Sequence, residues 1–86
     1  MTTSAEIRTA VYHLLAEVLP SRAPVDNIAN DETPTDEFMD SFDTFTFIQE
    51  LESKFNIEVA DHDVSSDNLG SVARIVQFVQ NKLASH

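Results

Sequence analysis

The stretch DSFDTFTFIQELESKF, residues 40–55, decides the fold. Asp40 is a good helix N-cap, because its carboxylate can accept hydrogen bonds from the free amides of a first turn. Apolar side chains then recur every three or four residues, as on one face of a helix. They are Phe42, Phe45, Ile48, Leu51 and Phe55, with Phe47 beside them. We therefore predict a helix over residues 41–55, with its phenylalanines mainly in the core.

Two further helices are predicted on either side of this one. Residues 4–19 and residues 71–84 each carry an apolar stripe with helical spacing. Thr3 or Ser4 can cap the first of these helices, and Pro20 prevents it from continuing.

The connections are predicted to be irregular. Residues 20–40 hold all three prolines and form a long loop, anchored by Val25 and Ile28. Ile57 and Val59 alternate with Glu58 in a short extended piece, and residues 61–69 form a loop with one helical turn. The fold class is therefore all-α: a small bundle of three main helices plus one short helix, with a long loop between the first two helices.

Length and composition limit the class of protein. Eighty-six residues, 42% of them apolar, suit a single compact domain over residues 1–86. The chain has no cysteine, so it has no thiol nucleophile of its own. No apolar run reaches the length of a membrane span, and no signal-like segment opens the chain, so a cytoplasmic location is expected.

The charge is strongly negative. Fifteen acidic residues face five Lys and Arg, for a net charge of −10. This balance argues against binding to nucleic acid or anionic lipid, and favours a partner with a basic docking patch. Thirteen of the acids, but only one base (Lys54), lie between Asp26 and Asp67. A solvated acidic surface that keeps a small protein monomeric is the alternative explanation.

No catalytic or metal-binding arrangement is evident. His13, His62 and His86 have no Ser or Cys partner at a recognisable spacing. A calcium loop starting at Asp61 fails, because Ser66 replaces the turn glycine and Val72 replaces the bidentate glutamate. We expect neither an enzyme nor a metal site.

Ser41 is the most informative residue. A serine directly after an N-cap has its hydroxyl at the positive end of the helix dipole, where a phosphodiester would be favoured. The Asp-Ser pair also occurs simply as a helix start, so the dipeptide alone is weak evidence.

The wider pattern resembles the acyl carrier protein family. Its members carry 4′-phosphopantetheine on the serine of an Asp-Ser-Leu motif that opens the second helix. The resemblance extends from Asp40 to Val59, with apolar residues one, four, seven and ten places after Ser41 and an Ile-acid-aliphatic triplet at Ile57. Residues 68–72, Asn-Leu-Gly-Ser-Val, are similar to the family's entry into its last helix.

The resemblance implies a carrier that is not itself an enzyme. Ser41 would be esterified from coenzyme A by a phosphopantetheinyl transferase, with Asp40 helping to present it. Acyl- or aminoacyl-loading ligases or synthases, and downstream transferases with basic docking patches, would be the partners. Asp43, Glu50 and Glu52 are expected to be exposed and to contact those patches. The cargo stays open between fatty acyl, polyketide and aminoacyl groups.

Departures from the family pattern point to an altered partner-binding face. Phe38 replaces a usual glycine, and Phe42 replaces leucine. Thr46 and Lys54 occupy positions where an acidic residue is common. Phe42 or Phe45 could also fill the space where an acyl chain would lie. The rival hypothesis from another class is an acidic helical interaction module with no prosthetic group.

The concentration of negative charge generates a first prediction. Repulsion among the acids should destabilise the protein at low ionic strength, so added salt or divalent cations should raise its melting temperature. A thermal melt followed by circular dichroism at increasing salt checks this. A melting temperature that stays constant or falls would contradict it.

Overall fold

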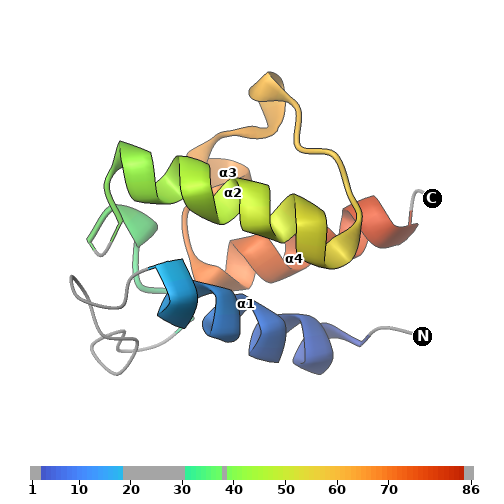
Figure 1. Cartoon of the computed structure of the whole chain (residues 1–86). Coiled ribbons are helices and arrows are strands. Elements are labelled where there is room, and N and C mark those ends of the chain that lie inside the picture. The colour runs from blue at the N-terminus through green and yellow to red at the C-terminus, as the bar shows by residue number, and fades with distance from the viewer. Residues whose placement is uncertain (1–2, 19–30, 38, 85–86) are drawn as a thin grey trace.

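The structure is a computed structural model, and it describes residues 3–18, 31–37 and 39–84. Its elements are α1 (Ser4–Val18), η2 (Thr35–Glu37), α2 (Ser41–Phe55), η3 (Asp61–Asp63), α3 (Ser66–Leu69) and α4 (Val72–Ala84) (Figure 1). No strand occurs among these described residues. The predicted architecture of three main helices plus one short helix is confirmed.

The three long helices pack around one core. In Figure 1, α1 runs in the opposite direction to α2 and α4 and packs against both of them, and α3 precedes and contacts α4. The buried hydrophobic side chains among the described residues form one cluster. Its members are Ile7, Val11, Leu14, Leu15, Met39, Phe47, Ile48, Leu51, Ile57, Leu69, Val72, Ile75, Val76, Phe78 and Val79. Phe78 is also buried, although the predicted apolar stripe of the last helix did not include it. A single domain over residues 1–86 stays a prediction.

Only part of the predicted apolar stripe of α2 is buried. Phe47 is 1% exposed, and Ile48 and Leu51 lie beside it in the core. Phe42 and Phe45 are 72% and 60% exposed. The expectation that the phenylalanines are mainly core residues is wrong for these two. α2 contacts the bundle along one side only, and Phe42 and Phe45 lie on its other side.

The helix ends follow local rules. The hydroxyl of Thr3 caps α1 by accepting a hydrogen bond from the amide of Glu6 at 3.2 Å. Ser71 does the same for α4, accepting from the amide of Arg74 at 3.2 Å. The expected loop anchors Val25 and Ile28, the stop at Pro20 and the departure at Phe38 lie outside the described residues.

Asp31 ties the segment before α2 to two helices. Its carboxylate accepts hydrogen bonds of 2.6 Å from Arg8 Nε and from the Tyr12 hydroxyl, both on α1. Its carbonyl accepts from the amide of Ala73 on α4 at 3.0 Å. The bond from Arg8, followed by that from Tyr12, lowers the pKa of Asp31. Burial, reinforced by the bond to Asp31, raises the pKa of Tyr12 to about 12.

A second polar contact holds the segment between α2 and α3 on the far end of α4. Asp63 accepts from Lys82 Nζ at 2.9 Å and from the amide of Ala60 at 3.0 Å. These two bonds, led by that from Lys82, lower the pKa of Asp63. The predicted loop with one helical turn is thus realised as η3 followed by α3.

The different burial of two phenylalanines on α2 gives a matched pair of variants. Phe47→Ala should lower the free energy of unfolding by about 3–5 kcal/mol, because it leaves a cavity in the core. Phe45→Ala should lower it by less than about 1 kcal/mol, because that ring is largely in solvent. Urea denaturation of both variants checks this. Equal losses would show that Phe45 belongs to the core.

Candidate functional site

Ser41 is the first residue of α2 and is exposed. Within the part of the chain that the structure describes, its hydroxyl has no hydrogen-bond partner. The amides of Ser41 and Phe42 likewise make no hydrogen bond to a described residue. Among the described residues, the start of α2 therefore presents a hydroxyl and two amides without hydrogen-bond partners, at the end of the helix where the dipole is positive.

Asp40 begins the helix as predicted. Its backbone is extended (φ −92°, ψ −175°), and its Oδ1 accepts from the amide of Asp43 at 2.8 Å. In return the amide of Asp40 donates to Asp43 Oδ2 at 3.4 Å, which completes a capping box. These two reciprocal hydrogen bonds close the first turn, in which Ser41 lies.

The three acids expected to meet partners differ in their surroundings. Glu50 is exposed, as expected. Asp43 is only 6% exposed, so the expectation of an exposed side chain there is wrong; its carboxylate completes the capping box. Glu52 is half-buried, and its Oε2 accepts from the amide of Val59 at 2.9 Å. That bond holds the chain just after α2, and it also contradicts the expected exposure of Glu52.

The segment that leads into α2 is attached to the end of α3. The amide of Thr35 donates to the carbonyl of Gly70 at 2.9 Å, and its hydroxyl donates to the carbonyl of Leu69 at 2.8 Å. Met39, one residue before the cap, is buried, and its amide donates to the carbonyl of Thr35 at 2.8 Å. Gly70 is required because a Cβ there would overlap the carbonyl oxygen of Ser66. These contacts place Ser41 relative to α3.

A groove lies beside the start of α2. It measures about 360 Å³ and lies between Thr44 of α2, the segment around Thr35, and the residues from Val64 to Gly70. Thr35 and Val64, which line this groove, were not predicted to lie near α2. A threonine followed by two acids after Pro34 is a recognisable turn signal, but nothing in it indicates contact with α3.

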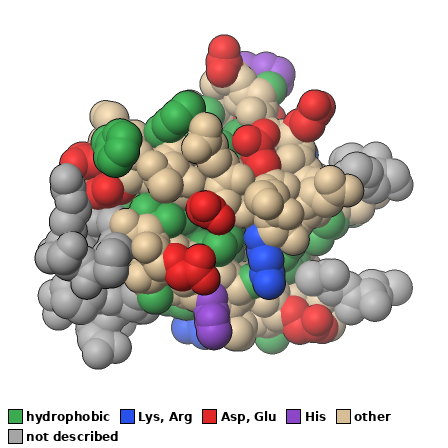
Figure 2. Space-filling model, viewed as in Figure 1, with side chains coloured by type: hydrophobic (Ala, Val, Ile, Leu, Met, Phe, Trp, Pro, Cys, Tyr) green, Lys and Arg blue, Asp and Glu red, His purple; other side chains and the backbone are tan. Residues whose placement is uncertain are grey.

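The surface around Ser41 is both aromatic and acidic. Figure 2 shows hydrophobic side chains projecting from the same end of the molecule as the start of α2, with acidic side chains nearby. The described large hydrophobic side chains that are exposed are Phe42, Phe45 and Val64. An apolar pair beside carboxylates is the composition of a protein-binding surface more than of an enzyme pocket.

The described residues bring together no group of three side chains that could hold a metal ion. His13 and His62 are exposed and lie on different elements, α1 and η3. No described helix is long and apolar enough to cross a bilayer.

The geometry at Ser41 fits a phosphodiester. An oxygen of such a group, bonded to the serine side chain, would lie next to the free amides of Ser41 and Phe42 and in the favourable field of α2. The hydroxyl is accessible to a modifying enzyme because Ser41 is exposed.

Comparison with known proteins agrees with this site. The family model described as "Phosphopantetheine attachment site" matches residues 9–79. An acyl carrier protein of Chlorobium luteolum (strain DSM 273 / BCRC 81028 / 2530) is 30% identical over 81 residues, covering 93% of this chain and 99% of the relative. An acyl carrier protein of Chlorobium phaeovibrioides (strain DSM 265 / 1930) is 28% identical with the same coverage.

The fold and the matched region thus define a phosphopantetheine-bearing carrier domain. The chain belongs to the acyl carrier protein family, whose members are carriers with a covalently attached 4′-phosphopantetheine group. The family resemblance found in the sequence is confirmed.

The capping box generates a prediction that separates charge from hydrogen bonding. Asp40→Ala should lower the free energy of unfolding by about 1 kcal/mol, because the amide of Asp43 loses its acceptor. Asp40→Asn should stay close to the wild type, because asparagine is an equally good N-cap. Chemical denaturation of the two variants measures this. A loss for Asp40→Asn as large as for Asp40→Ala would mean that the charge, not the cap, is what matters.

Proposed function

We propose that Ser41 is the residue to which 4′-phosphopantetheine is attached. The observation that carries this is an exposed serine at the N-terminus of α2, whose hydroxyl has no partner among the described residues, in a chain of the phosphopantetheine attachment family. Asp40 and Asp43 fix the backbone on either side of the hydroxyl, so Ser41 is presented in one orientation.

The proposed role is to carry an acyl or aminoacyl group between enzymes. The prosthetic group would supply a thiol, and the cargo would be bound to this thiol as a thioester. The chain itself has no cysteine that could provide one. The protein's own residues would supply the attachment point and the surface that partners recognise. A phosphopantetheinyl transferase, an acyl- or aminoacyl-loading ligase or synthase, and downstream transferases are the partners of this proposal.

Phe42 and Phe45 are assigned to partner recognition and not to the filling of an acyl cavity. Their exposed fractions of 72% and 60% support this, because a ring that filled an internal space would be buried. The groove beside Thr44 is lined by other side chains, so these two rings do not fill it. A partner pocket that accepts two aromatic side chains next to basic residues would complement this end of α2.

Among the acids of α2, Glu50 is the proposed contact with a basic patch on a partner, because its carboxylate is exposed. Asp43 and Glu52 already serve hydrogen bonds within the chain, so we assign them an indirect role. A single exposed ion pair contributes little, so these contacts should act collectively and weaken with salt.

The attachment is tested by intact mass spectrometry after incubation with coenzyme A and a broad-specificity phosphopantetheinyl transferase. The wild-type chain should gain one phosphopantetheine. Ser41→Ala should gain none, because the accepting oxygen is missing, whereas Ser53→Ala, which removes another exposed serine of the same helix, should be modified normally. No gain by a folded and previously unmodified wild-type chain would favour the acidic interaction module without a prosthetic group.

A further inference from the structure

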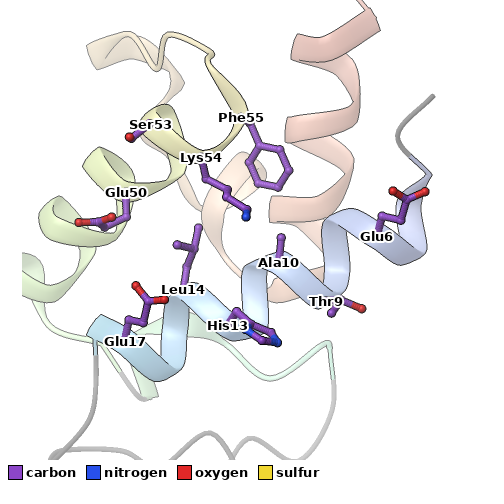
Figure 3. A pocket seen from close by; sticks show the side chains of 10 residues that line it. All are labelled: Glu6, Thr9, Ala10, His13, Leu14, Glu17, Glu50, Ser53, Lys54 and Phe55. Carbon is purple, nitrogen blue, oxygen red and sulfur yellow. The ribbon is translucent and has the colours of Figure 1, made fainter.

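A second concave surface lies away from Ser41, between α1 and the C-terminal half of α2 (Figure 3). It is a cleft of about 670 Å³, larger than the groove beside Thr44. Ala10, Leu14 and Phe55, all buried or half-buried, give it an apolar floor. Exposed polar side chains of both helices form its rims. Two antiparallel helices with an apolar floor between them offer the groove into which a third helix packs.

The charges along this cleft alternate. Glu17 of α1 and Glu50 of α2 lie together at one end, and Glu6 lies at the other end, as Figure 3 shows. Lys54 of α2 lies between these two ends and extends toward α1, and His13 lies on the rim formed by α1. The order along the cleft is therefore negative, positive, negative.

Lys54 has no ion pair with any described residue, although it is the only base between Asp26 and Asp67. The described residues give Glu17 and Glu50 no ion pair either. The cleft thus holds separated charges of both signs over an apolar floor. Such a surface selects a partner by the order of its charges, because a mismatched order places like charges opposite each other.

Other occupants fit less well. A metal ion is disfavoured, because no three ligating side chains come together among the residues described. A second copy of the chain is disfavoured, because two chains of net charge −10 repel each other. An anionic lipid surface is disfavoured for the same reason.

We propose that the α1–α2 cleft is a docking site for an amphipathic helix of a partner protein, which places a basic side chain at each end, an acidic side chain against Lys54 and an apolar side chain on the floor. This surface goes beyond the carrier role, because it includes α1 and does not require a prosthetic group. It would let the chain stay bound to one protein while the start of α2 meets another.

The spacing of the partner helix follows from α1. Glu6 and Glu17 are eleven residues apart, which is about 16 Å along a helix. A probe helix should therefore carry Arg, Leu, Glu and Arg at i, i+4, i+7 and i+11, positions that share one face. A control peptide of the same composition exchanges the last two, giving Arg, Leu, Arg and Glu.

The test measures binding of both peptides to the isotope-labelled full chain by NMR titration, using Ser41→Ala so that modification has no influence. The first peptide should bind about tenfold more tightly, and the shifted amides should lie on α1 and the C-terminal half of α2. Lys54→Glu should reduce the preference to about one, because it removes the positive charge in the middle of the cleft. Glu58→Lys, which changes a nearby exposed acid outside the cleft, should leave the preference unchanged.

Four outcomes would overturn the proposal. They are equal affinity for the two peptides, a preference that survives Lys54→Glu, shifted amides confined to the start of α2 around Phe42, and Mg²⁺ alone producing the same shifts and displacing the peptide. A negative result for the cleft would not contradict the proposed attachment at Ser41, because the attachment is tested separately by intact mass spectrometry.

Discussion

The rotation of α2 about its own axis is the constraint on which the rest of the structure depends. Phe47, Ile48 and Leu51 enter the core against α1 and α4. Once these three are buried, every other residue of the helix has its direction determined by the 100° step of an α-helix. The rings of Phe42 and Phe45 then face solvent. Ser41 lies two turns before Ile48 on nearly the same side of the helix, and it is exposed because it is the first residue of α2. The same rotation turns Glu50 and Lys54 toward the cleft beside α1.

The position of Ser41 along the bundle is set by hydrogen bonds on both sides of it. The capping box of Asp40 and Asp43 fixes the backbone where the preceding segment meets α2. Thr35 connects that segment to the carbonyls at the end of α3. A short helix of four residues contributes little to stability alone, yet here it positions the start of α2. A modifying enzyme would therefore meet a preorganised serine.

The two concave surfaces differ in the side chains that form them. The end of α2 that carries Ser41 combines aromatic rings with acids, and suits partners that approach a substrate-bearing group. The cleft beside α1 combines both signs of charge with an apolar floor. The two surfaces involve opposite ends of α2, and Glu50, the proposed contact with a basic patch, lies at the cleft and not beside Ser41. In the further proposal, a partner helix in the cleft therefore leaves Ser41 accessible.

The sequence alone determined the helix ranges, the cap at Asp40, the place of Ser41 after it and the excess of negative charge. These follow from local rules, since a cap or a helical stripe depends on residues within about four positions of one another. The family resemblance added the attachment chemistry.

Only the tertiary structure decided which side of α2 is buried, that Asp43 turns inward, and that Lys54 faces α1. Phe42, Phe45 and Phe47 are equally apolar, so composition and spacing do not tell which of them reaches the core. That choice depends on where α1 and α4 lie, and their positions arise from contacts between residues far apart in the chain.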